Sequence, residues 1–106
     1  MNTVNPSFGL ADFLGRYRAA LVILSGEARG MEYRLDQPRT ALGRGPGVDL
    51  ALDDAELRCR HALVLFRGSG FELRDFDAET SGVELKNGDC FRLGGHEFAF
   101  VLEERR

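Results

Sequence analysis

The sequence is poor in the residue types that build metal centres, disulfide scaffolds and membrane spans. Its 106 residues include two cysteines, two histidines and no tryptophan. A structural zinc site needs four Cys or His ligands, and Cys59 and Cys90 lack a C-x-x-C spacing, so we expect neither a bound metal nor a disulfide framework. No apolar stretch approaches the ~18–20 residues of a membrane span, so we expect no insertion into a membrane.

Positive charge is also scarce, and it is almost all arginine. The formal net charge is −3 and the isoelectric point is about 5.4, whereas a nucleic-acid-binding domain usually has a value above ~9, so we expect no nucleic-acid partner. Lys86 is the only lysine. Guanidinium groups suit phosphate and carboxylate, which leaves a local anion site open, although a GC-rich genome explains the same arginine excess. The first fifteen residues contain no Lys or Arg and do not resemble a signal peptide, which favours a cytoplasmic protein.

The length fits one domain, with a different kind of segment at the start of the chain. Domains most often run ~100–150 residues, and 43% hydrophobic with 29% charged residues is typical of soluble globular proteins. Within residues 1–18, four side chains fall on helical spacing, namely Phe8, Ala11, Leu14 and Arg18. Two glycines in the same segment disfavour a helix. We expect an N-terminal extension over 1–18, either a short helix or irregular, followed by one domain over 19–104.

From residue 19 onward the pattern has the two-residue period of β-strands. Short apolar or alternating runs are separated by glycine-bearing turns at intervals of roughly 8–12 residues, which is typical of a β-sandwich or barrel. The expected strands cover residues 19–24, 31–35, 40–43, 49–52, 61–66, 71–74, 90–93 and 97–102. We predict an all-β antiparallel sandwich with Cys90 in its core. Its long loops, 43–49, 53–61 and 75–83, should lie at one end and carry the function.

The predicted loops and strand ends carry short motifs in a fixed order. The motifs are Leu42-Gly43-Arg44, Asp49-Leu50-Ala51-Leu52-Asp53-Asp54, Leu57-Arg58-Cys59-Arg60-His61-Ala62, Leu73-Arg74-Asp75-Phe76, and Leu85-Lys86-Asn87-Gly88-Asp89 followed by Leu93-Gly94. Each motif alone is weak, but their order and spacing over roughly residues 20–102 resemble the forkhead-associated (FHA) family. The resemblance implies an FHA-like β-sandwich that recognises phosphothreonine in a partner protein.

The resemblance also implies candidate phosphate- and peptide-binding residues. Arg44 matches the arginine that binds phosphate in the family. Arg58 stands where the family has a serine whose hydroxyl donates to the phosphate, and Cys59 stands where the family has a basic residue. Arg60 falls at a variable position. Thr80 or Ser81 takes the place of the asparagine that binds the peptide backbone.

Three further residues are expected to support the binding loops. Gly43 and Gly82 would let neighbouring segments pack closely. The resemblance implies that His61 is a brace whose ring nitrogens bond to loop backbone. About ten residues of strand and turn that follow the third loop in the family are missing, so we expect a shorter sheet edge after Gly82.

These departures lead to one main hypothesis and two alternatives. The main hypothesis is a protein–protein interaction module of FHA type with impaired phosphothreonine recognition, which binds a protein partner that is phosphorylated on threonine or not. The first alternative is an active phosphothreonine-peptide reader in bacterial Ser/Thr kinase signalling, with a rebuilt Arg44/Arg58 pocket. An enzyme is not expected, because the glycines near Arg44 lack phosphate-loop spacing and the Cys59–His61 pair lacks an oxyanion site. We expect no cofactor, and self-association stays open.

Overall fold

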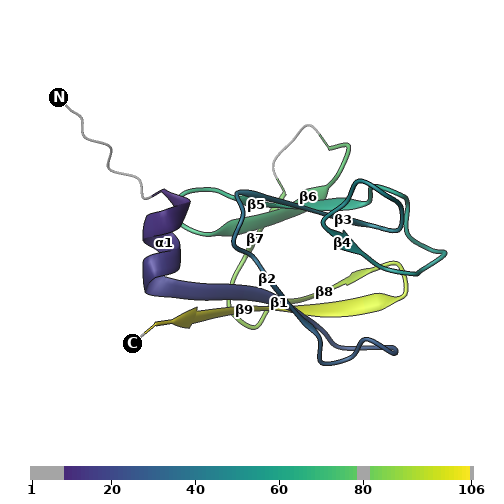
Figure 1. The fold of residues 1–106 in the computed structure, drawn as a ribbon, viewed down its shortest axis with the longest axis horizontal. Helices are drawn as coiled ribbons and strands as arrows, with labels where there is room; N and C mark the ends of the chain where they lie inside the picture. The colour runs from purple at the N-terminus through teal and green to yellow at the C-terminus, as the bar shows by residue number, and fades with distance from the viewer. Residues whose placement is uncertain (1–8, 79–81, 106) are drawn as a thin grey trace.

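A computed structural model describes residues 9–78 and 82–105 as two packed β-sheets with one short helix at one end (Figure 1). The elements in chain order are α1 (Leu10–Arg16), β1 (Tyr17–Ile23), β2 (Glu32–Arg34), β3 (Arg39–Gly43), β4 (Leu50–Ala51), β5 (Ala62–Phe66), β6 (Phe71–Asp75), β7 (Val83–Leu85), β8 (Cys90–Leu93) and β9 (His96–Glu104). The predicted all-β FHA-like sandwich is confirmed. No helix among these residues is long and apolar enough to cross a membrane.

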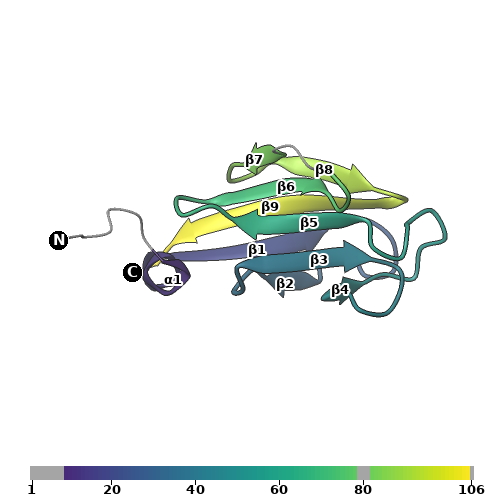
Figure 2. The ribbon, with the colours of Figure 1, turned by 90° about the horizontal axis from the view of Figure 1, so that it is seen from above.

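The strands form a four-stranded sheet and a five-stranded sheet. The first has the order β2-β1-β9-β8 and the second the order β4-β3-β5-β6-β7. All pairs are antiparallel except β3 with β4, which is parallel. Figure 2 shows the two sheets lying one over the other with their strands roughly aligned. Seven residue pairs join β1 to β9, so the N- and C-terminal strands form the centre of the first sheet.

The core follows from the alternation along the strands. Leu21 and Ile23 of β1 and Phe98 and Phe100 of β9 point toward the second sheet and are almost fully buried. From the opposite side they meet a matching set of apolar residues on the second sheet, which includes Leu42, Val64 and Phe71. The large aromatic side chains fill the space between the two sheets. Each buries roughly 150–250 Å², so they dominate the packing of the core.

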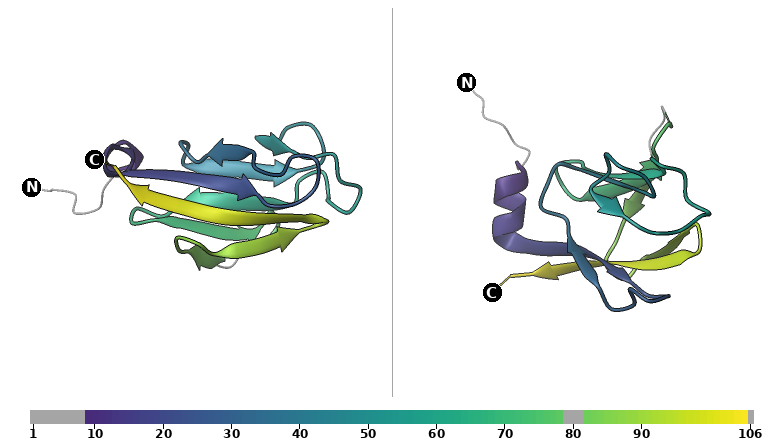
Figure 3. Two further views of the ribbon diagram at one scale, coloured as in Figure 1. Left: turned by 90° about the horizontal axis from the view of Figure 1, so that it is seen from below. Right: turned by 45° about the vertical axis from the view of Figure 1, so that its right-hand side comes forward.

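Helix α1 closes the end of the sandwich opposite the long loops (Figure 3). Phe13 is 4% exposed, and its ring centroid lies 5.2 Å from that of Phe66 and 5.7 Å from that of Phe71. Arg105 holds the C-terminal end of the helix, because its Nε donates to the carbonyl of Leu14 at 2.6 Å and to that of Tyr17 at 3.3 Å. The helix therefore packs on the sandwich through an aromatic side chain and is tied to the end of β9.

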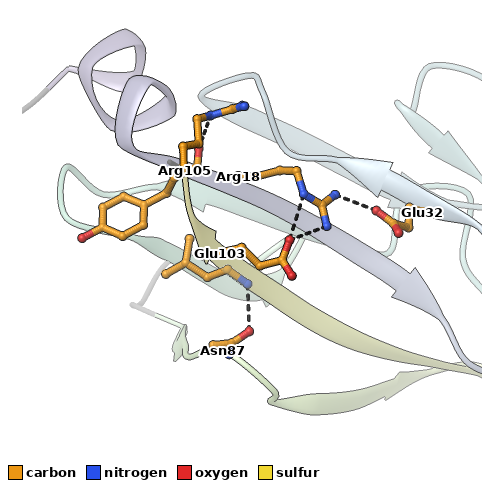
Figure 4. Close-up of polar contacts among 7 residues, drawn as sticks. Arg18, Glu32, Asn87, Glu103 and Arg105 are labelled. Atoms are coloured by element: carbon orange, nitrogen blue, oxygen red, sulfur yellow. Dashed lines mark hydrogen bonds and ion pairs between the residues drawn. The ribbon is translucent and has the colours of Figure 1, made fainter.

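Polar contacts across the first sheet are shown in Figure 4. The Arg18 guanidinium lies between Glu32 of β2 and Glu103 of β9, with N–O distances of 2.7 and 2.8 Å. Asn87, in the turn before β8, accepts a hydrogen bond from the backbone N–H of Leu102. These contacts join strands that are far apart in the sequence.

The structure differs from the sequence expectations at three places. Residues 17 and 18 are strand rather than helix, because Tyr17 pairs with Glu104 and Arg18 with Glu103. A three-residue strand, β7, forms where no strand was expected. The prediction that Cys90 lies in the core is wrong: Cys90 is exposed, since it lies with Arg92 on the outer face of β8 while Phe91 packs against the core from the inner face. The division into an extension over 1–18 and a domain over 19–104 stays a prediction.

Candidate functional site

Three loops meet at the end of the sandwich away from α1 (Figure 3), and residues 43–49, 53–61 and 75–78 are called the loop end below. The first two loops are joined through their backbones. The N–H of Arg44 donates to the carbonyl of Arg58 at 3.0 Å, and the N–H of Gly45 donates to that of Cys59 at 3.2 Å. This ladder-like contact fixes the backbone of Arg44, the residue that matches the phosphate-binding arginine.

Glycine is required on both sides of Arg44. A Cβ atom on Gly43 would lie 2.1 Å from the carbonyl oxygen of Cys59, and one on Gly45 would lie 2.8 Å from the Cβ and Sγ atoms of Cys59. Both distances are far inside van der Waals contact. The glycines therefore allow the second loop to pack directly against the backbone that carries Arg44.

The Arg44 side chain is exposed and available. Its guanidinium group makes no hydrogen bond or ion pair with any residue in the ranges 9–78 and 82–105. A cation in this state keeps all five of its N–H donors for a ligand. Its open donors suit an anion, and its role as a phosphate contact stays a prediction.

Arg58 is in the opposite state, because its guanidinium group is already paired. It contacts the carboxylate of Asp75, the carboxylate of Asp77 at 3.0 Å and the carbonyl of His61 at 3.0 Å. These bonds join the second loop to the third. An anion that approached Arg58 would compete with two carboxylates for its donors.

The third loop is organised around Asp75. The backbone N–H of Asp77 donates to Asp75 at 3.0 Å, and this bond, together with the guanidinium of Arg58, lowers the pKa of Asp75 below its ordinary value of 3.8. Asp75 therefore stays ionised near neutral pH. This negative charge lies beside Arg58, which the resemblance aligns with the phosphate-binding serine of the family.

His61 lies where the three loops meet. Its Nδ1 accepts a hydrogen bond from the backbone N–H of Arg58 at 3.1 Å, and its carbonyl accepts one from the N–H of Phe76 at 3.0 Å. Its own N–H donates to the carbonyl of Leu42 at 2.9 Å. The residue therefore contacts the strand before the first loop, the second loop and the third. That its ring braces a binding pocket stays a prediction.

Arg60 and Phe76 form an exposed cationic surface beside this cluster. The Cζ atom of Arg60 lies 5.9 Å from the centroid of the Phe76 ring, and that of Arg39 lies 5.4 Å from it. Both distances are within the range of cation–π attraction. Arg60, Phe76 and Arg58 also line a shallow pocket of about 530 Å³. A bound peptide could contact Arg60 here, next to the Arg44 loop.

The remaining predicted residues belong to the end of the third loop. Thr80 and Ser81 lie outside the described residues. Gly82 lies so close to β6 that a Cβ atom would be 2.0 Å from the carbonyl oxygen of Leu73. The chain therefore passes from the loop end into β7 without room for a side chain at this position.

A hydrogen-bonded contact between Asp54 and His96 joins distant segments and was not predicted from the sequence. The Oδ2 atom of Asp54 lies 2.8 Å from Nδ1 of His96 and accepts the N–H of Gly95 at 2.8 Å, while Oδ1 accepts the N–H of Glu56. The hydrogen bond with His96, followed by these backbone donors, lowers the pKa of Asp54. The pair anchors the second loop to the turn between β8 and β9. Because Asp54 and His96 are 42 positions apart in the sequence, no local sequence pattern predicts their contact.

Comparisons with known proteins show the family to which the chain belongs. Residues 22–104 match the family described as the cytoplasmic domain of the inner membrane component of T3SS. The chain is 32% identical over 92 residues to the glycogen accumulation regulator GarA of Mycolicibacterium smegmatis, which covers 78% of this chain and 58% of GarA. It is 40% identical over 105 residues to the oxoglutarate dehydrogenase inhibitor of Corynebacterium efficiens, which covers 91% of this chain and 74% of the inhibitor.

A solved structure shows the same architecture. Mycobacterium tuberculosis EmbR in complex with a low affinity phosphopeptide superposes with a TM-score of 0.71 at 27% sequence identity, over 84% of this chain and 25% of EmbR. The chain thus spans between a quarter and three quarters of these three relatives. The fold, the glycine-flanked Arg44 loop and the sequence matches lead to one assignment. The chain belongs to the matched T3SS-component family, whose fold is FHA-like, and it is a forkhead-associated domain, a module for protein–protein interaction.

Proposed function

We propose that this domain binds a protein partner through its loop end and recognises phosphothreonine weakly, with Arg44 as the main phosphate contact. The single observation that carries the proposal is the contrast between two arginines. The Arg44 guanidinium has no partner among the described residues, whereas that of Arg58 is held by Asp75 and Asp77. One open cation supports phosphate binding, and the second is neutralised.

The expected loss of affinity follows from the missing donors. The family's serine is replaced by Arg58, which removes a hydrogen bond to the charged phosphate of about 1.5–3 kcal/mol, and its asparagine is replaced by the shorter hydroxyl of Thr80 or Ser81, which removes a neutral hydrogen bond of about 0.5–1.5 kcal/mol. Every 1.4 kcal/mol is a tenfold change in affinity. Losing such contacts moves a micromolar complex toward the millimolar range. The negative charges of Asp75 and Asp77 add an unfavourable field for an incoming phosphate.

The comparisons support the class of partner. EmbR, a relative of similar fold, was solved with a phosphopeptide, which supports a phosphorylated protein segment as the ligand of this chain. The names of GarA and the oxoglutarate dehydrogenase inhibitor support a regulatory role exerted by binding rather than by catalysis. The description of the matched family supports a location in the cytoplasm. We assign the binding function to the sandwich, residues 19–104.

A competing possibility is that Arg44 and Arg58 bracket one phosphate together. This would require Arg58 to leave Asp75, Asp77 and the carbonyl of His61, and so to break three polar contacts. The arrangement in the free domain favours weak recognition over this rebuilt pocket.

A pull-down from a lysate, with and without phosphatase treatment, tests the proposed function. We expect a partner whose recovery falls several-fold, but not to zero, after phosphatase treatment. Arg44→Ala should remove this phosphate-dependent part and leave the rest. The matched control is Arg34→Ala, because Arg34 is another exposed arginine and lies on β2, away from the loop end. Recovery that is unaffected by both phosphatase and Arg44→Ala would contradict the assignment of Arg44.

A further inference from the structure

A second groove adjoins the loop end, because Asp53 belongs to both. It has a volume of about 460 Å³ and lies between the β1–β2 hairpin, β4 and the residues that follow β4. Ile23 at the end of β1 and Leu50 and Leu52 around β4 form its floor and are at most 7% exposed, so Met31 is the large apolar lining residue that is exposed. A groove of this size and character is typical of a ligand site. Neither Arg44 nor Arg58 lines it.

The hairpin beside the groove exposes apolar side chains. Met31, which lines the groove, is 58% exposed, and Leu24 at the other side of the hairpin is 38% exposed. Among the residues that the structure describes, only Val83 is a further large hydrophobic with comparable exposure. Methionine adapts its shape to different partners, and exposed apolar clusters mark interaction sites. Both observations point to a peptide rather than to a rigid small molecule.

The rim of the groove is acidic, and its carboxylates are unpaired. Glu27 on the hairpin and Asp53 after β4 line it, and neither makes a hydrogen bond or ion pair with a residue in 9–78 or 82–105. No arginine or lysine lines the groove, in a chain where 14 of 106 residues are basic. The negative charge of the rim therefore favours a ligand that carries a cationic group next to its apolar group.

One wall of the groove is held rigid. His96 lines it, with Nδ1 bonded to Asp54 and with its Nε2 atom 3.9 Å from where a Cβ atom on Gly26 would lie. Leu57, on the second loop, packs against the same turn, 2.9 Å from the position of a Cβ on Gly94. The groove is therefore a preformed feature between two anchored segments.

From this arrangement we propose that the groove binds a segment of a partner protein in which a large apolar side chain stands next to lysine or arginine. The apolar side chain enters between Met31 and Leu50, and the cation pairs with Glu27 and Asp53 at the rim. This contact is independent of phosphate recognition at Arg44. It gives the domain a second specificity that an unphosphorylated segment can satisfy.

The test uses the ¹⁵N-labelled chain and two capped peptides in NMR titrations. The probe contains the sequence Ser-Leu-Arg-Leu-Arg-Ser, and the control replaces its arginines with glutamate. We expect the probe to shift the amide signals of Glu27, Met31, Ala51, Asp53 and His96 with saturation, and the control to shift them at least tenfold less at equal concentration. Addition of 0.5 M salt should weaken the probe several-fold, because the rim charges are exposed.

Variants separate this site from the loop end. The double variant Glu27→Lys with Asp53→Lys should weaken probe binding at least tenfold. Glu104→Lys, a charge reversal of an exposed residue at the far end of β9, and Arg44→Ala should each stay within twofold of the unchanged domain. Equal binding of the acidic peptide, shifts confined to residues 44 and 58, or no shifts at all would overturn the proposal. So would shifts of the groove residues on raising protein concentration without peptide, which would assign the groove to a second copy.

Discussion

At the scale of single residues, the loop end depends on close backbone contacts that only glycine permits. Gly43 lies where any Cβ would collide with the carbonyl oxygen of Cys59. The sequence motif identified this glycine, since the resemblance assigns it a packing role. The partners of Arg58 could not be predicted, because they depend on how the ends of β5 and β6 meet in space.

Gly43→Ala should destabilise the domain. The new methyl group must displace the second loop, and overpacking of this kind costs about 1–3 kcal/mol. The matched control is Gly15→Ala in α1, where a Cβ would meet nothing within 4 Å. Since alanine is favoured over glycine in a helix by about 0.8–1 kcal/mol, the control should be neutral or stabilising. Urea unfolding of both variants measures the difference, and equal midpoints would show that the loop contact is not tight.

Asp54 should give the domain an acid-sensitive contribution to stability. Its folded pKa is lowered from 3.8, so its bonds to His96 and to the backbone of Glu56 and Gly95 stabilise the fold above that pH. The contribution is lost as the pH falls below 3.8 and through the folded value.

The variant Asp54→Asn isolates this effect. At pH 7 it should unfold at a lower urea concentration than the unchanged domain, and the gap should narrow as the pH falls below 3.8. Unfolding midpoints between pH 3 and 7 provide the measurement. A gap that is constant across this range would show that the carboxylate charge does not carry the contact.

At the scale of elements, the periodicity of the sequence predicted the long central strands correctly but missed the edge strand β7, and the burial expected for Cys90 in the edge strand β8 was wrong. The apolar run at 19–24 and the alternation at 97–102 correspond to β1 and β9, in which buried residues recur along the strand. The three residues of β7 are too few to show a period, and their pairing with β6 decides their conformation. Cys90 was misplaced because neighbouring residues of a strand point to opposite faces, and in β8 Phe91 takes the inner face.

Helix α1 shows the same limit and has a testable consequence. The helical spacing extended to Arg18, yet the helix ends at Arg16 because pairing with β9 begins at Tyr17. Phe13 nevertheless joins the core, so Phe13→Ala should destabilise the domain by about 3–5 kcal/mol.

The control for this prediction is Leu10→Ala in the same helix, since Leu10 is only partly buried against the core. It should cost clearly less in the same urea unfolding experiment. A loss of under about 1 kcal/mol for Phe13→Ala would mean that α1 does not support the sandwich, because a buried aromatic side chain contributes more than that.

At the scale of the whole molecule, two kinds of surface adjoin at one end of the sandwich. The loop end carries Arg44 and Arg60, whose cations have no carboxylate partner among the described residues, while the groove beside the hairpin carries Glu27 and Asp53. The fold and the position of Arg44 followed from the sequence. The pairing of Arg58 and the groove did not, because both are built from segments that only folding brings together.

The central claim is that Arg44 is the main phosphate contact and that Asp75 and Asp77 pair with Arg58, which keeps its guanidinium group from binding phosphate. Calorimetric titration with a phosphothreonine peptide selected from a degenerate library, into the unchanged domain, Arg44→Ala and Asp77→Asn, tests it most directly. We predict that Arg44→Ala weakens binding at least tenfold, and that Asp77→Asn strengthens it several-fold by removing one of the two carboxylates that hold the Arg58 guanidinium. Tight binding by the unchanged domain, with no gain from Asp77→Asn, would contradict the account.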